Sequence, residues 1–295
     1  MSAEAHQSFL NDNQTRFSPD TIRSYRISLT QFFSFCKKDF SDVKATDVRA
    51  WLSSLEEQGL KPRTIHLKLS ALKSFLEENL TKKNPTLTVK TPKKDDSLPY
   101  YLSRREITLL QELTRNDLRD RALVETLYAT GVRISELINI KLEDIKWENR
   151  QIWIRKGKGN KERFVLFSHD CAERLKAYLE NRKINSDFLF SNSRGGRWNR
   201  TLIEIRFQKF SETLGFKVRP HTMRHTFAAH LAEKNMPQSY IQELLGYVNI
   251  NTTRIYTRST SVGAMQGVNH CHSPYLVERV RNVLINMYLE VMINS

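Results

Sequence analysis

Apolar side chains recur three or four positions apart over much of the first ninety residues, a spacing that puts them on one face of a helix. The first such helix begins at Ser18-Pro19, since serine caps a helix well and proline suits its first turn. A second is capped by Thr46 and stopped by Gly59, and a third runs from about residue 63 to residue 80. The inward positions expected in these helices are Ile22, Tyr25, Leu29, Phe32, Phe33 and Cys36, then Val48, Trp51, Leu52 and Leu55, then Ile65, Leu69, Leu72, Phe75 and Leu76. This pattern predicts a small helical domain.

The helical spacing stops between residues 81 and 99. This stretch, TKKNPTLTVKTPKKDDSLP, contains three prolines and five lysines, a composition that favours an extended linker over a surface loop within one domain. A new helix start follows, because Ser103 and Glu106 form a capping box. We therefore expect a helical domain over residues 1–90, a linker over 91–100 and a second domain over 101–295.

The second domain is predicted to be mainly helical with a small β-hairpin. Helices are expected over residues 117–130, ended by Gly131, and over 168–182 and 199–214, with a further short helix capped by Ser135 just after Arg133. The runs QIWIRK and ERFVLF are β-rich, and the intervening GKGNK has the turn chemistry of a hairpin. Lys158 is expected at its tip.

Residues 220–257 are expected to form three short helices that carry one chemical site. The first begins at Pro220, the second spans 237–246, and the third spans 251–256 and ends at Tyr256, which has no evident core to fill. His221 and Arg224 are three positions apart, so they share a helix face. An arginine fork binds two phosphate oxygens, a histidine moves protons near neutral pH, and a phenol is a covalent nucleophile. An isolated H-x-x-R is more often a solvated helix face, so other features have to decide.

The charge balance favours a polyanionic partner. Lysine and arginine outnumber aspartate and glutamate by 47 to 32, a formal net charge of +15, which suits nucleic acid. An anionic membrane surface is the rival, but no run of about 18 apolar residues and no basic-then-apolar leader is present. We expect a soluble, cytoplasmic protein that does not bind membranes.

No metal or other cofactor is expected. The three cysteines are far apart and form neither a C-x-x-C pair nor a disulfide framework. His221 and His225 have the spacing of a metal pair, but no Asp or Glu ligand stands at a suitable helix position.

Four segments, ATGVRISEL, GKGNKER, HTMRH and LLGYVNINTTRIYT, resemble in order and spacing the boxes of the tyrosine recombinase (phage integrase) family. The resemblance covers nearly the whole chain. It implies a helical SAM-like N-terminal DNA-binding domain, a mixed α/β catalytic domain, and a homotetramer on double-stranded DNA with inverted-repeat core sites. It also implies site-specific recombination, such as resolution or integration of a mobile element.

The resemblance also implies a catalytic set. Tyr256 is the nucleophile, Arg133 and Arg224 clamp the phosphate, Lys158 protonates the leaving oxygen, and His221 is an acid/base partner. Such a set needs no metal, because fixed guanidiniums stabilise the charge that develops on the phosphate oxygens. The expected product is a 3′-phosphotyrosine with a free 5′-hydroxyl, and no ATP is required.

Three positions near this set have alternative interpretations. Tyr247 stands where the family usually has histidine or tryptophan; it either donates a hydrogen bond to the phosphate or is only a packing aromatic. Glu136 either orients its neighbours or is an ordinary exposed helical glutamate. His225 is expected to be structural.

Two rival functions and one regulatory element complete the prediction. The rivals are a type IB topoisomerase and a catalytically silent DNA-binding protein. A tail helix from Ser273 has one apolar stripe, formed by Val277, Val280, Leu284, Met287 and Val291. It is expected to dock on a neighbouring subunit, the alternative being that it packs on its own domain.

Overall fold

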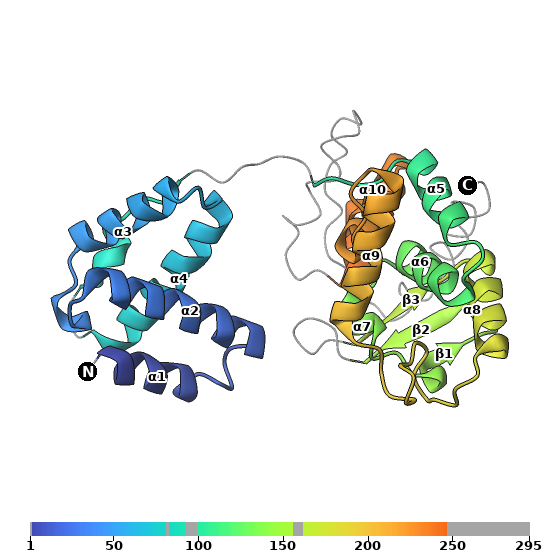
Figure 1. Ribbon diagram of the computed structural model, residues 1–295, viewed down its shortest axis with the longest axis horizontal. Coiled ribbons are helices and arrows are strands. Elements are labelled where there is room, and N and C mark those ends of the chain that lie inside the picture. The colour runs from blue at the N-terminus through green and yellow to red at the C-terminus, as the bar shows by residue number, and fades with distance from the viewer. Residues whose placement is uncertain (1, 81–82, 93–98, 156–161, 247–295) are drawn as a thin grey trace. The chain divides into compact units, whose positions relative to one another are not determined.

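The computed structural model describes residues 2–80, 83–92, 99–155 and 162–246, and the chain divides into two compact units, Met1–Ser97 and Leu98–Ser295 (Figure 1). Lys158, Tyr247 and Tyr256 lie outside the described residues. So do the helix expected over 251–256 and the tail helix expected from Ser273. No helix of the part described is both long and apolar enough to cross a membrane.

Unit 1 is a helical bundle, as predicted. It contains α1 (Ser2–Asp12), α2 (Pro19–Cys36), α3 (Ala45–Glu57) and α4 (Pro62–Asn79), with a 3₁₀ turn at Phe40–Asp42. The aromatic core is confirmed: the rings of Phe32 and Trp51 meet edge to face with centroids 5.0 Å apart, and Phe33 and Phe75 do so at 5.5 Å. Phe9 and Leu10 complete this core from α1, a helix that the sequence analysis did not predict.

Part of the stretch between residues 81 and 99 that was expected to be extended folds onto the bundle instead. Residues Pro85–Thr88 form a 3₁₀ turn rather than an extended chain. The Asn84 side chain explains this: its oxygen accepts from the Thr86 backbone N–H at 3.0 Å, and its amide donates to the Lys73 carbonyl of α4 at 3.0 Å. Thr86 is buried as a result.

Unit 2 is mainly helical with a small sheet, which confirms the predicted fold class. Its helices within the described residues are α5 (Arg104–Leu113), α6 (Leu118–Thr130), α7 (Ile134–Leu137), α8 (His169–Asn181), α9 (Arg200–Leu214), α10 (Pro220–Glu233) and α11 (Gln238–Leu245). The predicted hairpin is present as β2 (Gln151–Ile154) and β3 (Arg163–Leu166), paired antiparallel with Ile152 opposite Val165. A third strand that was not predicted, β1 (Ile145–Lys146), pairs with β2 and follows a 3₁₀ turn at Leu142–Asp144.

Helix α6 lies at the centre of unit 2. It packs against α8 and against α10, and ten of its thirteen residues are buried, including the charged Asp120 and Glu125. Both buried carboxylates are paired, Asp120 with Arg206 and Glu125 with Arg121, as buried charges require. In Figure 1, α6 lies between α10 and α8.

Gly131 ends α6 in the left-handed conformation, with φ of 59°. A Cβ built on Gly131 would come within 2.4 Å of the Phe227 ring of α10, so only glycine fits there. This close approach brings the chain just after α6, which carries Arg133, against the helix that carries Arg224.

Candidate active site

A pocket of about 1140 Å³ opens where the chain after α6, the face of α9 and the start of α10 meet. Arg133, His221 and Arg224 all line it, although the first is far from the other two along the sequence. Three further cations and two carboxylates also contribute to its wall: Arg200, Lys217, Arg219, Glu204 and Glu212. Three of the six predicted site residues therefore share one pocket with a positive balance of charge.

Arg224 is held rigidly from within the protein. Its side chain is among the largest fully buried ones, and only 1% of the residue is exposed. Nη1 donates to the Gly131 carbonyl at 2.6 Å, and Nη2 donates to the Leu245 carbonyl at 2.6 Å. These carbonyls stand at the C-terminal ends of α6 and α11, where the helix dipole favours a cation. The guanidinium is thus fixed before any ligand arrives.

Arg133 begins α7 and is joined to Glu136. Its backbone N–H donates to Glu136 Oε2 at 2.9 Å, and its Nη1 donates to Oε1 at 2.8 Å. The prediction that Ser135 caps this helix is wrong, because Arg133 is the N-cap residue and the carboxylate of Glu136 closes the capping box.

Glu136 is not the ordinary exposed helical glutamate of one interpretation, since only 5% of it is exposed. It binds two arginines: besides Arg133, Arg163 of β3 donates from Nη1 to Oε1 at 3.0 Å and from Nη2 to Oε2 at 2.8 Å. Burial alone would raise the pKa of Glu136, but the hydrogen bonds from Arg163 and the nearby charges outweigh it and hold the pKa below its usual value. Glu136 is therefore an anion at neutral pH.

Arg163 is the residue that the sequence analysis missed. Its Nε also donates to the Leu244 carbonyl at the end of α11, at 3.0 Å. A signal was available, because Arg163 and Val165 alternate onto the same face of β3, and Val165 is a buried core residue. An arginine on the core side of a strand requires a buried acceptor, although the sequence does not say which one.

His221 and His225 lie one turn apart on α10. Their ring centroids are 4.3 Å apart and nearly perpendicular, and His221 is exposed at the pocket whereas His225 is half-buried. The predicted shared face of His221 and Arg224 is confirmed, since both side chains line the pocket.

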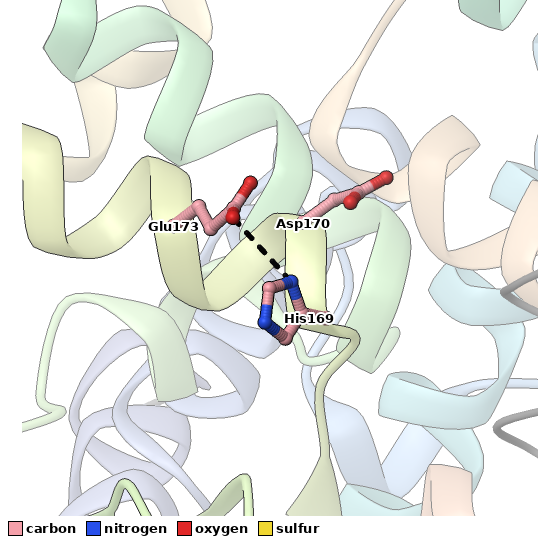
Figure 2. Close-up of side chains that lie close together, drawn as sticks. All are labelled: His169, Asp170 and Glu173. Carbon is pink, nitrogen blue, oxygen red and sulfur yellow. Dashed lines mark ion pairs between the residues drawn. The ribbon is translucent and has the colours of Figure 1, made fainter.

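One group of possible metal ligands occurs among the described residues, and it lies outside the pocket. His169, Asp170 and Glu173 are all exposed in the first turns of α8, with 3.5 Å between His169 Nδ1 and Glu173 Oε1 (Figure 2). Acidic side chains are common at a helix start because they interact favourably with its dipole. We therefore interpret this group as a solvated helix start.

Two family models match the chain. Residues 101–261 match the model of the phage integrase family, and residues 7–83 match that of the phage integrase N-terminal SAM-like domain. The first match contains the helices α5 to α11 and the three-stranded sheet.

Individual relatives agree with these matches. The tyrosine recombinase XerC of Staphylococcus carnosus is 37% identical over 262 residues, which cover 82% of this chain and 87% of that protein. The tyrosine recombinase XerA of Pyrococcus horikoshii is 36% identical over 248 residues, covering 83% and 85%. The solved structure of the Tn1549 transposon integrase in complex with a circular intermediate DNA has a TM-score of 0.71 at 18% identity, covering 96% of this chain and 99% of that one. This last likeness shows a shared fold.

Proposed function

This chain belongs to the phage integrase family, and on that premise we propose that it cuts and rejoins DNA strands through a covalent 3′-phosphotyrosine at Tyr256. It is an enzyme of the tyrosine recombinase type, and its relatives support site-specific recombination as its activity. The proposal adds the chemical step and the residues that perform it.

The observation that carries the proposal is the pocket shared by Arg133, His221 and Arg224. Attack on a phosphodiester loads negative charge onto the non-bridging oxygens, and two preorganised guanidiniums stabilise that charge. The carbonyls of Gly131 and Leu245 fix the Arg224 guanidinium, so little reorganisation is needed during the reaction. His221 stands at the exposed edge of the same pocket and is positioned to move a proton.

The remaining roles follow from the match to the family boxes. Tyr256 attacks the phosphorus and displaces the 5′ oxygen of the next nucleotide, which leaves with a proton donated by Lys158. The strand is resealed when a 5′-hydroxyl attacks the phosphotyrosine, so the bond is conserved and no ATP is consumed. Tyr247 donates a hydrogen bond to the phosphate in place of the usual histidine or tryptophan.

The proposed partner is double-stranded DNA with inverted-repeat core sites, bound by four copies of the chain. The formal charge of +15 suits this polyanion. The names of the relatives XerC and XerA, both tyrosine recombinases, also support DNA as the partner. The proposed task is resolution or integration of a mobile element, carried out in the cytoplasm. The tail helix from Ser273 is proposed to dock on the neighbouring subunit.

The test is the formation of a covalent adduct on duplex oligonucleotides that tile the DNA flanking the gene. The wild-type protein is expected to form an adduct that survives denaturation, and Tyr256→Phe is expected to form none while keeping its affinity for the same duplex. Tyr240→Phe, on α11, is the matched control and should form the adduct normally. An adduct formed by Tyr256→Phe would disprove the assignment of the nucleophile. Relaxation of a plasmid that lacks the site would instead favour a topoisomerase.

A further inference from the structure

We propose that Arg163 is a positioning residue that holds Arg133 and the C-terminal end of α11 in one fixed arrangement beside the pocket. The inference rests on the proposed function, because it concerns how the phosphate-binding arginines are aligned. It extends that function to a side chain that does not line the pocket.

The contacts of Arg163 join three separate segments of unit 2. From β3, its two terminal nitrogens bind both oxygens of Glu136, in α7, at 3.0 and 2.8 Å. Its remaining nitrogen, Nε, binds the Leu244 carbonyl, in α11, at 3.0 Å. A planar guanidinium satisfies this set of acceptors at once, which a lysine ammonium does not.

Glu136 transmits the effect to the pocket. The same carboxylate accepts from the backbone and the side chain of Arg133, so its orientation fixes where the Arg133 guanidinium points. Without Arg163, a carboxylate that is almost fully buried has to satisfy its oxygens through Arg133 alone. The expected result is a shift of Arg133 toward Glu136 and away from the pocket.

Two arginines bind neighbouring carbonyls at the C-terminal end of α11. Arg163 binds the carbonyl of Leu244, and Arg224 binds that of Leu245 while also binding Gly131, two residues before Arg133. The last carbonyls of a helix lack partners within the helix, so these bonds stabilise its end. Arg163 therefore connects α11 to Glu136 of α7, and Arg224 connects α11 to Gly131, just before α7.

The surroundings of Gly246 give independent evidence that Arg163 packs closely against the end of α11. It ends α11 with φ of 63°, and a Cβ built there would lie 3.1 Å from both Cδ and Nη1 of Arg163. The chain thus leaves α11 in direct contact with this side chain. A residue larger than glycine would displace the guanidinium or the end of the helix.

The first experiment compares Arg163→Gln and Arg163→Lys with wild type in single-turnover adduct formation at saturating DNA. Arg163→Gln should lower the rate constant about tenfold to a hundredfold, the cost of a catalytic group misplaced by about 1 Å, while affinity for the duplex changes less than about threefold. The rate constant of Arg163→Lys should lie between those of wild type and Arg163→Gln, because lysine keeps the charge but not the bidentate contact with Glu136.

Arg206→Gln is the matched control. Arg206, of α9, binds Asp117 and the buried Asp120 at 2.7 and 2.5 Å, so its loss also breaks a partly buried ion pair of unit 2. It does not line the pocket. It should therefore lower the midpoint of thermal unfolding without lowering the rate constant at saturating DNA, measured well below that midpoint.

A second readout separates positioning from general stability. If Arg163 acts through Glu136, then Arg163→Gln combined with Glu136→Gln should be no slower than the slower single variant, rather than losing the product of both effects. Should Arg163→Gln fail to fold, Arg163→Lys carries the same comparison.

The outcomes are distinct. A wild type that forms no adduct overturns the proposed function itself. A wild type that forms it, with Arg163→Lys and Arg163→Gln at the wild-type rate, overturns only the role of Arg163. Equal rate losses in the Arg163 and Arg206 variants, or independent effects at Arg163 and Glu136, also overturn it.

Discussion

Two clusters of arginines and carboxylates in unit 2 use the same chemical groups in opposite ratios. Around the pocket, one carboxylate, Glu136, is shared by two arginines, Arg133 and Arg163. Between α6 and α9, one arginine, Arg206, is shared by two carboxylates, Asp117 and Asp120. The first cluster has a surplus positive charge and the second a surplus negative charge.

The pKa values of the two buried carboxyls, Glu136 and Asp120, shift in opposite directions, in keeping with the surplus charge of each cluster. The pKa of Glu136 lies below its usual value, because its arginines outweigh burial. The pKa of Asp120 lies above its usual value, because burial, together with a smaller repulsion from Asp117, outweighs the hydrogen bond and the charge of Arg206. A buried ion pair alone therefore does not identify a site; the surplus charge beside a pocket does.

The largest expected difference between the clusters concerns activity. Arg133→Ala should slow adduct formation at least about a hundredfold, since removing one donor to a developing oxyanion typically costs that much. Glu136 keeps Arg163 as a partner in this variant, so the fold should survive. Arg206→Ala should form the adduct at the wild-type rate at saturating DNA. A similar loss in both variants, measured by single-turnover assay, would remove the distinction between the clusters.

The next difference concerns stability as a function of pH. Glu136, with a lowered pKa, contributes stability that is present above its unfolded-state pKa of about 4.3 and is lost as the pH falls through its folded-state pKa. Glu136→Gln should therefore cost more free energy of unfolding at pH 7, about 3 kcal/mol, than at pH 4.

Asp120 should behave in the opposite sense. Its raised pKa makes it contribute stability that is fully present below about pH 3.9 and is lost as the pH rises through its folded-state pKa. The cost of Asp120→Asn should accordingly shrink between pH 4 and pH 7. Denaturant unfolding at both pH values measures the two trends, and trends of the same sign would contradict the assignments.

The smallest expected difference compares two glycines that end helices. Gly246 touches Arg163, whereas Gly215, at the end of α9 with φ of 74°, has nothing within 4 Å of a built Cβ. Gly215→Ala should cost only the left-handed strain, about 1 to 2 kcal/mol of unfolding free energy. Gly246→Ala should cost more than this and also slow adduct formation, because it displaces Arg163. Equal costs with no effect on the rate would mean that the contact at Gly246 is loose.

The long helices could be predicted from the sequence because their apolar periodicity is strong. The predictions failed at two helix starts, where a carboxylate takes the place of the expected hydroxyl cap. Thr46 and Ser135 were both assigned as helix caps, yet the N-cap residues are Lys44 and Arg133. In both helices the backbone N–H of the cap donates to a carboxylate three residues later, Asp47 in α3 and Glu136 in α7. An acidic residue at that position can start a helix without a hydroxyl cap.

The site was predictable only in part, for a related reason. Arg133, His221 and Arg224 stand in boxes that the family resemblance identifies, and the structure brings all three to one pocket. Arg163 and the burial of Glu136 depend on α7 packing beside β3, a contact between segments that no local pattern encodes. Strand alternation puts Arg163 on the core side of β3, but its acceptors, Glu136 and the Leu244 carbonyl, lie far from it in the sequence.

The enclosure of α6 sets a hierarchy of amide hydrogen exchange. Amides of a helix buried on all sides exchange only when the whole unit opens, whereas those of a short helix at the margin exchange through local fraying. The eight residues of α11 are such a short helix, attached to the rest of unit 2 through the buried side chains of Ile241 and Leu245 and through the guanidiniums of Arg163 and Arg224. Deuterium should therefore enter α11 before it enters α6, and the interval between the two measures how firmly these contacts hold the helix in place.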